Sequence, residues 1–280
     1  MKVTRKDIAK MAGVSTATVS YVINGSNRVG EETRERVQRI IEEYNYRPDL
    51  IARAMSTRST MQIALLVNDL FNNFFAEIVT EFEKAAIQQG YCVNICTSDR
   101  SISNYIDSFV TRRMDGVFCM VSPTRIDLQK LYALRQDDIP VLISGNSTAD
   151  RSRVSLIELD YAQGMLIALE YLKGCGHRRI AYLSAFPQDF ECDNRLKMFL
   201  KYYDQIFPTD EKLLITGDYP FPSTVDAGYD LAKRLIDRGS PFTAVITTND
   251  SMAIGCIEAL QKHGFRVPED VSVMGFDNIP

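Results

Sequence analysis

The sequence predicts an N-terminal all-α domain followed by a larger α/β domain with parallel sheets. Two observations carry this prediction. Residues 3–46 place apolar side chains at helical spacing in three successive runs. From Thr60 onward, short apolar runs alternate with longer amphipathic segments, which is typical of parallel strands joined by helices. The expected divisions are a headpiece at 1–47, a hinge helix or linker at 48–59, and two α/β lobes at 60–157 and 158–280.

The start of the chain predicts two short helices joined by a tight corner. Thr4, followed three residues later by Asp7, predicts a capping box. Gly13-Val14-Ser15 forms the corner, and Ser15 is expected to cap the second helix. This pattern is that of a DNA-binding helix-turn-helix, in which the start of the second helix meets base edges in the major groove. The residues that this mode exposes are Thr16, Ala17 and Tyr21.

The apolar positions predict one small core for this headpiece. The alternative is an ordinary pair of core helices, but corner, cap and polar outer face coincide here. A third helix is expected at 31–44, after a loop that contains Gly25 and Gly30. The side chains predicted to point inward are Ile8, Ala12, Val19, Val22, Ile23, Val37, Ile40, Ile41 and Tyr44.

A short segment with helix-favouring residues follows the headpiece at 49–56. It is about two turns long, and an isolated helix needs roughly 12–15 residues in water. We therefore expect this segment to be helical only when something holds it.

The charge is unevenly distributed along the chain. The net charge is −4, but residues 1–60 carry 11 Lys and Arg against 7 Asp and Glu, which leaves −8 for the rest. A basic head on an acidic body fits a protein that touches nucleic acid at one end. Because neither a secretory signal nor an apolar run of membrane-spanning length occurs, we expect a cytoplasmic protein without a membrane partner.

Cysteine and histidine indicate no metal site, disulfide framework or other cofactor. Cys92 and Cys96 lie in an apolar run that predicts a buried strand, so structural thiols are expected. His177 and His263 each stand beside a glycine at a predicted helix end, and both are interpreted as capping or surface residues.

The remainder predicts seven strands and seven helices in alternation. Glycines at 90, 176, 239 and 264 are expected to end helices before the next strand. The predicted strands are 61–67, 91–96, 116–121, 140–144, 179–184, 243–247 and 271–276. The predicted helices are 74–89, 102–113, 126–136, 161–173, 194–206, 225–238 and 251–263.

Polar side chains gather in the loops after these strands. Ligands of open α/β sheets bind beyond the carboxyl ends of the strands, so these loops predict a small-molecule site. Carboxylates, amides, one arginine and aromatic rings suit a polyhydroxylated or ring-shaped ligand. The alternative is that Asp160, Asn194 and Asp250 cap the helices that follow them, which is at least as probable for the last two.

The headpiece resembles the lactose-repressor (LacI/GalR) family of bacterial transcription regulators. The resemblance rests on Val3-Thr-x-x-Asp-Ile-Ala-x-x-Ala-Gly-Val-Ser-x-x-Thr-Val-Ser20, on Asn24-Gly25 and on Tyr46-Arg-Pro48. It implies a repressor that binds a pseudo-palindromic operator as a homodimer, with Met55 as a minor-groove wedge in the hinge helix. Tyr21 stands where many relatives carry Arg. The predicted DNA-binding residues are Thr4, Ser15, Thr16, Ala17, Thr18, Tyr21, Asn24, Arg28 and Met55.

The body resembles the family's effector domain, a periplasmic-binding-protein-like pair of lobes. The resemblance rests on Asp69-x-x-Asn-x-Phe-Phe75, Asn249-Asp-x-Met-Ala-x-Gly255 and Val271-Ser-Val-Met-Gly-Phe-Asp277. It implies a sugar as the effector, with a nucleobase or nucleoside as the alternative. Since family members continue beyond the Gly-Phe-Asp strand, we expect this sequence to be a fragment. The effector contacts implied are Asp69, Phe75, Asp160, Arg195, Asn249 and Asp277.

Two other classes of protein share features with this body. A solute-binding protein of transport would need export and has no use for residues 1–60. An enzyme would need a nucleophile or paired acids. Gly174-Cys-Gly176 looks like the opening of a dinucleotide-binding fingerprint, but it precedes a predicted strand instead of following one. The sequence therefore predicts a regulator without enzymatic activity.

Overall fold

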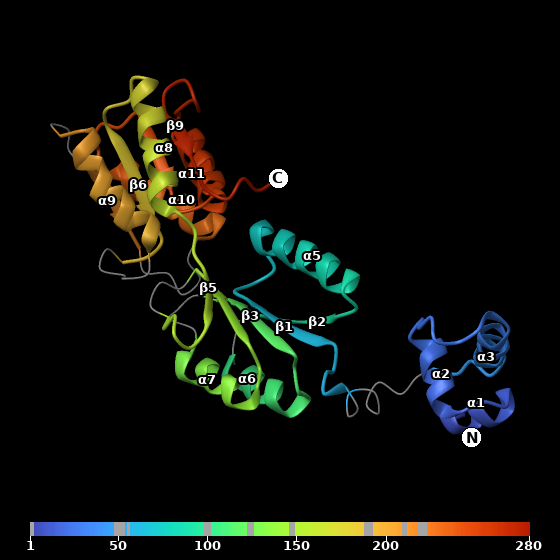
Figure 1. The fold of residues 1–280 in the computed structure, drawn as a ribbon. Helices are drawn as coiled ribbons and strands as arrows, with labels where there is room; N and C mark the ends of the chain where they lie inside the picture. Colours follow the sequence, from blue (N-terminus) through green and yellow to red (C-terminus); the bar gives the residue numbers. More distant parts are fainter. Residues whose placement is uncertain are drawn as a thin grey trace. The chain divides into compact units, whose positions relative to one another are not determined.

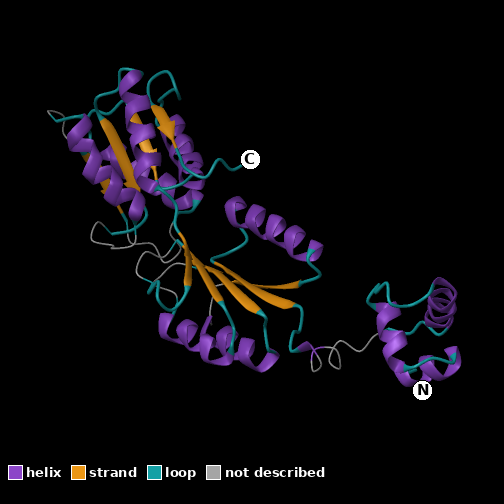
Figure 2. Cartoon of the chain, in the orientation of Figure 1, coloured by secondary structure: helices purple, strands orange, loops and turns teal. Residues whose placement is uncertain are grey.

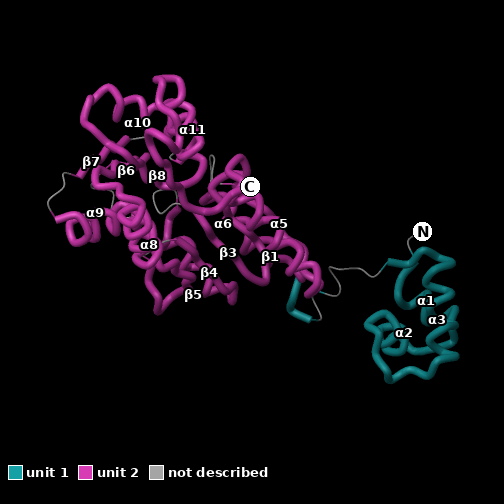
Figure 3. Tube along the Cα trace, turned by 90° about the horizontal axis from the view of Figure 1, so that it is seen from above, with its two compact units in different colours: residues 1–60 teal, residues 61–280 magenta. Residues whose placement is uncertain are grey.

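The chain forms two compact units in the computed structural model, Met1–Thr60 and Met61–Pro280 (Figure 3). Within the described parts of the chain, no helix is long and apolar enough to cross a membrane. The structure describes residues 3–47, 54, 57–97, 102–121, 126–145, 149–187, 193–208, 212–217 and 223–280.

Residues 3–47 of the first unit form three helices, α1 (Arg5–Ala12), α2 (Thr16–Ile23) and α3 (Glu31–Glu43), which Figure 1 labels. The capping box that the sequence predicts at α1 is confirmed: the Thr4 side chain accepts from the Asp7 N–H, and the Asp7 carboxylate accepts from the Thr4 N–H. Gly13 turns the chain between α1 and α2 with φ of 65°, a conformation that disfavours any side chain. These local devices fix the corner of the helix-turn-helix.

The headpiece has its own hydrophobic core. Tyr44 departs from the prediction: it is the C-cap of α3 and 45% exposed, because the helix ends one residue before it. The core residues are Ile8, Ala9, Ala12, Val19, Val22, Val29 and Val37, with Ile23, Ile40 and Ile41 packed against them.

The described residues of the second unit form two parallel sheets. The first has the strand order β2-β1-β3-β4-β5, and the second has the order β7-β6-β8-β9. The strands of the first sheet are β1 (Gln62–Val67), β2 (Cys92–Thr97), β3 (Gly116–Met120), β4 (Val141–Ser144) and β5 (Ser155–Ile157). Those of the second are β6 (Ile180–Ser184), β7 (Leu213–Thr216), β8 (Ala244–Thr247) and β9 (Ser272–Met274).

Helices cover both faces of each sheet, which Figure 2 shows as purple helices on either side of the orange strands. In the first sheet, α5 (Asn73–Gln88) lies on one face, while α6 (Ile102–Arg112) and α7 (Leu128–Ala133) lie on the other. Alternate residues of β1 divide accordingly: Leu65 packs toward α5, and Leu66 packs toward α6 and α7.

The second sheet is layered in the same way. On one face lie α8 (Tyr161–Gly174) and α9 (Asn194–Ile206), and on the other lie α10 (Val225–Asp237) and α11 (Asp250–Lys262). On β6, Tyr182 faces α8 and α9, whereas Leu183 faces α10 and α11. A strand that is buried on both faces has a continuous apolar sequence, which explains why β6 could be predicted.

The structure differs from the predicted elements at the sheet edges. The strands β5 and β7 were not predicted, and β9 is shorter than the predicted 271–276. The helix predicted at 126–136 begins later because Asp127 caps it by accepting from the N–H groups of Gln129 and Lys130, and a 3-10 turn (Leu134–Asp137) follows it. The four glycines expected to end helices all have positive φ, from 68° to 91°.

Some predictions for cysteine and histidine need correction. Cys92 is exposed, because β2 is an edge strand, and Cys175 is exposed as well. His177 is half-buried rather than a surface residue: its ring nitrogens lie 2.9 Å from the Thr243 hydroxyl and 3.1 Å from the Ser272 hydroxyl. His263 is the C-cap of α11, as predicted. No cluster of metal-ligating side chains occurs among the described residues.

Candidate functional site

The exposed face of α2 forms the candidate DNA-reading surface. Thr16, Ala17 and Tyr21 are all exposed, whereas Val19 and Val22 are buried in the headpiece core. Ala17 and Tyr21 lie four residues apart and therefore on one face of the helix. This is the side that the sequence assigns to base edges.

Three hydroxyl groups assigned to DNA serve the helix ends in this structure. Thr4 Oγ1 lies 2.6 Å from Asp7 Oδ2 in the capping box. Ser15 Oγ accepts from the Thr18 N–H at 3.1 Å and lies 2.9 Å from Thr18 Oγ1. These groups hold the first turns of α1 and α2 in place beside the reading face.

Two of the remaining predicted DNA contacts, Asn24 and Arg28, lie around the end of α2. Asn24 is its exposed C-cap. Arg28, in the loop after it, places its guanidinium carbon 5.6 Å from the centre of the Tyr21 ring. Met55 lies outside the described residues, as does most of the predicted hinge.

The second sheet brings two predicted effector contacts together at its carboxyl edge. Arg195 Nη2 donates to Asp277 Oδ1 at 2.8 Å, although 82 residues separate the two in sequence. Arg195 lies in the first turn of α9, and Asp277 follows β9. Helix α9 starts there because Asp193, a buried N-cap, accepts from the Leu196 N–H and from the Ser184 hydroxyl at the end of β6.

Two aromatic rings flank the Arg195 guanidinium. Its carbon lies 5.1 Å from the Tyr161 ring centre and 5.3 Å from that of Phe276, which is the range of cation–π contact. Arg195 Nε is buried and has no hydrogen-bond partner among the described residues. The guanidinium therefore retains a donor for a further acceptor.

Burial changes the chemistry of the Asp277 carboxyl. Desolvation raises its pKa from 3.8 to about 6; Arg195 opposes this shift and the charge of Asp250 adds to it. The pair is partly enclosed, with side-chain exposures of 20% for Arg195 and 9% for Asp277. Asp277 can thus accept hydrogen bonds at neutral pH while remaining easy to protonate.

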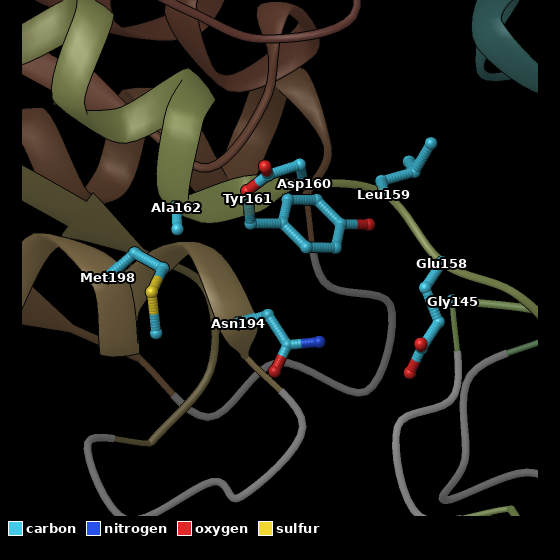
Figure 4. Close-up of a pocket in the computed structure, with 8 residues that line it drawn as sticks. All are labelled: Gly145, Glu158, Leu159, Asp160, Tyr161, Ala162, Asn194 and Met198. Carbon is cyan, nitrogen blue, oxygen red and sulfur yellow. The ribbon is translucent and has the colours of Figure 1, made fainter.

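A pocket of about 300 Å³ opens beside Tyr161. In Figure 4 the Tyr161 ring and the Asn194 amide point into the same space, with Glu158 across from Asn194. A carboxylate, an amide, a phenol and an apolar wall together suit a small ligand with several hydroxyl groups. The lining residues are Gly145, Glu158, Leu159, Asp160, Tyr161, Ala162, Asn194 and Met198.

The other predicted effector contacts have structural partners. Asp160 lines the pocket, and its carboxylate also caps α8 by accepting from the Gln163 N–H. Asp69 accepts from the N–H groups of Phe71 and Asn72 in its own loop, and Phe75 packs against the first sheet. The Asn249 side-chain amide accepts from the Met252 N–H and donates to the Ser223 carbonyl.

The capping alternative is confirmed for Asp160 but is wrong for Asn194 and Asp250. Asn194 and Asp250 are first residues of their helices, and the caps stand one residue earlier, at Asp193 and Asn249. Asp250 instead accepts from the Ile279 N–H at 3.0 Å. Neither Tyr161 nor Phe276 was predicted as a site residue, although both contact Arg195 and adjoin predicted contacts, Asp160 and Asp277.

Comparisons with known families cover both units. Residues 4–49 match the bacterial regulatory proteins of the lacI family, and residues 169–280 match the periplasmic binding protein-like domain. A protein of Vibrio atlanticus (strain LGP32), HTH-type transcriptional repressor PurR, is 34% identical over 280 residues. This match covers 99% of the chain and 82% of that protein. A repressor of the same name from Mannheimia succiniciproducens is 32% identical over 281 residues, with the same coverage.

Solved structures show the same arrangement of elements. The lac repressor dimer bound to operator and the anti-inducer ONPF matches with a TM-score of 0.81 and 25% identity, over 99% of this chain and 83% of that one. The transcriptional regulator CelR in complex with cellobiose matches with a TM-score of 0.66 and 29% identity, over the same shares of the two chains.

Proposed function

Because the chain belongs to the LacI family of bacterial regulatory proteins and is a DNA-binding transcriptional repressor rather than an enzyme, we propose that it acts as an effector-controlled homodimer. The proposed target is a pseudo-palindromic operator in the cytoplasm. One headpiece offers few base-reading side chains, so a symmetric pair is needed for useful affinity. The similarity to a lac repressor dimer bound to operator supports this proposal.

The exposed row on α2 is the observation that carries the DNA-binding part of the proposal. Ala17 presents a methyl group suited to the methyl group of thymine, and Tyr21 presents a ring and a hydroxyl suited to a base edge or a phosphate. Selection from randomised duplexes should yield two inverted half-sites. Replacing the thymines of the selected half-sites with deoxyuracil, one at a time, should weaken binding at the position that Ala17 contacts. Selected sequences without inverted symmetry would contradict the homodimer.

The effector that we propose is a sugar bound beside Arg195 and Tyr161. Arg195 keeps a buried donor, Asp277 offers an acceptor pair, and Glu158, Asp160 and Asn194 supply further polar groups for hydroxyls. Sugar rings also stack on aromatic side chains, and Tyr161 lines the pocket. Cellobiose in the similar CelR structure is consistent with this chemistry.

A nucleobase or nucleoside is the second candidate. The contacts of the Tyr161 and Phe276 rings with Arg195 favour it, because a planar heterocycle can stack on an aromatic ring while an arginine hydrogen-bonds its edge. A thermal-shift screen of sugars, sugar phosphates, purines and nucleosides separates the two classes. A ligand at ~100 times its dissociation constant stabilises the protein by about 2.7 kcal/mol.

The assignment of Arg195 has a direct test by calorimetry with the ligand found in that screen. Arg195→Ala and Asp277→Asn should each weaken binding by about 1–3 kcal/mol, because buried polar groups then lose a partner. The matched control is Arg266→Ala, since Arg266 pairs with Asp270 in the same sheet system but at the surface. Equal affinity of Arg195→Ala and the parent would refute this pocket.

A further inference from the structure

The loop between α2 and α3 is fixed by backbone contacts next to the reading face. The Ser26 N–H donates to the Tyr21 carbonyl at 2.9 Å, so the loop leaves α2 at the level of Tyr21. Arg34 of α3 donates to the Ser26 carbonyl at 2.8 Å, and Val29 is buried in the headpiece core. Hydrogen bonds therefore hold residue 26, burial holds residue 29, and Arg28 lies between these two fixed positions.

From this position the Arg28 side chain contacts Tyr21 of α2. Its guanidinium carbon lies 5.6 Å from the centre of the Tyr21 ring, within the distance of a cation–π contact. No carboxylate of residues 3–47 forms an ion pair with Arg28. Because neither an ion pair nor burial occupies the guanidinium, its N–H donors remain available to a ligand.

The position of the Tyr21 ring also determines on which face of the headpiece the positive charge of Arg28 lies. Tyr21 shares the helix face of Ala17, four residues earlier, and both are exposed. A guanidinium held over that ring therefore stands at the end of the base-reading row and not on the flank of the headpiece. An arginine oriented in this way can present its planar fork of donors to the O6 and N7 acceptors of guanine in the major groove.

We infer that Arg28 and Tyr21 form one reading unit, in which Arg28 recognises a guanine in each operator half-site and the Tyr21 ring holds its guanidinium in place. The inference rests on the proposed function, since it assumes that α2 reads the operator. In this unit, Arg28, which lies in the loop after α2, provides base specificity, and Tyr21, which belongs to α2, positions it.

The experiment compares full-length variants by selection from randomised operators and by affinity for the selected site. The variants are Arg28→Ala, Tyr21→Leu, Tyr21→Phe and the Arg28→Ala/Tyr21→Leu double variant. The parent should require one guanine per half-site, and 7-deazaguanine at that position should weaken its binding about tenfold or more, because it removes the N7 acceptor. Arg28→Ala and Tyr21→Leu should lose the guanine preference and the sensitivity to 7-deazaguanine.

The cycle tests whether the two residues act together. If the ring holds the arginine, the double variant should discriminate guanine no less than either single variant, and Tyr21→Phe, which keeps the ring, should behave as the parent. Arg39→Ala, which removes an exposed arginine of α3, should keep the parent's base preference. Circular dichroism of each variant confirms that the headpiece is folded.

Two results would overturn the inference. A uniform loss of affinity for all sequences in Arg28→Ala, with the salt slope reduced by about one unit, would make Arg28 a phosphate contact only. Unchanged guanine preference in Tyr21→Leu would show that the ring does not position Arg28. A parent protein that selects no sequence at all would instead refute the proposed function, so the two failures are distinct.

Discussion

At the scale of single residues, the partly enclosed Arg195–Asp277 pair consists of two side chains that we propose as effector contacts. Asp277 adopts φ of 102°, which is unusual for a residue with a side chain, and its carboxylate faces Arg195. Burial raises its pKa to about 6 even though Arg195 favours the ionised form. Strained and partly desolvated groups of this kind cluster at functional sites.

The raised pKa of Asp277 predicts a specific dependence of stability on pH. Between pH 4 and 6 the folded protein keeps this proton and the unfolded chain has lost it, so the free energy of unfolding falls as pH rises. Asp277→Asn should remove this component. The difference in unfolding free energy between the parent and Asp277→Asn should shift by on the order of 2 kcal/mol from pH 4.5 to pH 7, measured by urea unfolding.

The control for this experiment is Asp270→Asn. The exposed ion pair with Arg266 lowers the pKa of Asp270 to about 2, so its contribution is present above pH 4 and lost only as pH falls toward 2. The difference between the parent and Asp270→Asn should thus be constant from pH 4.5 to pH 7. A constant difference for Asp277→Asn as well would contradict the raised pKa.

The pairing of single residues was the least predictable part of this site. Sequence patterns place Arg195 and Asp277 after different strands, and only the resemblance to the family selected them from the other polar residues in those loops. Asn249 was selected in the same way, but its amide caps α11 and donates to the Ser223 carbonyl. A cap and a ligand contact require the same residue types, so local sequence does not separate them.

At the scale of elements, α10 and α11 pack unusually closely. A Cβ atom added at Gly228 would overlap the Met252 carbonyl oxygen, and one added at Gly255 would overlap that of Val225. Backbone atoms cannot turn aside as a side chain can. The two glycines therefore set the distance between the helices that cover one face of the second sheet.

We expect Gly228→Ala and Gly255→Ala each to destabilise the protein by about 2–3 kcal/mol or more, because the helices must move apart. Gly174→Ala is the matched control, since a Cβ there meets no atom within 4 Å and alanine favours a helix by about 1 kcal/mol over glycine. Urea unfolding of the three variants measures the effect. Equal stability of Gly228→Ala and Gly174→Ala would show that the close approach is not required.

The cap of α2 gives a second prediction about an element. Ser15→Ala should destabilise the headpiece by about 0.5–2 kcal/mol, because the Thr18 N–H loses its acceptor, and operator affinity should fall with it. Ser15→Asn, which supplies another capping side chain, should retain most of both. Thermal unfolding and operator binding of the full chain provide the measurement. Unchanged stability and affinity of Ser15→Ala would show that this cap does not stabilise the headpiece.

Elements were predicted best where periodicity was strong. The bounds of α9 and the corner between α1 and α2 agree with the sequence, because caps and apolar spacing point to the same residues there. The strands β5 and β7 were missed because they are short edge strands with only one sheet neighbour each. Less burial leaves less apolar pattern in the sequence, so such strands resemble loops.

At the scale of the whole molecule, we propose that the link between the two units transmits the influence of an effector on DNA binding. An effector changes operator affinity only as far as it prefers one arrangement of the dimer over another. The hinge proposed at 49–56 would carry this preference if it folds only on DNA. Its residues lie largely outside the described part of the chain, so this role stays a prediction.

Substitutions that weaken the hinge helix should reduce operator binding and leave effector binding unchanged. Leu50→Gly or Ala54→Gly should reduce helix formation by roughly 0.8–1 kcal/mol per site and so weaken operator binding, with effector affinity nearly unchanged.

Met55→Ala should lower specific affinity and DNA bending, whereas non-specific binding should persist because no charge is lost. Gel-shift and bending assays measure both. An unaltered bend in Met55→Ala would exclude a wedge at this residue.

The small core of the headpiece also bears on how this protein could change over generations. Its buried members all come from residues 8–37, and the buried clusters of the body contain only residues from 64 onward. The free-energy effects of substitutions at sites without shared partners are additive. A substitution that changes the operator preference of α2 should therefore leave the effector pocket intact. Over generations, such a protein can therefore come to control new genes with the same effector, or the same genes with a new effector, by substitutions in one unit at a time.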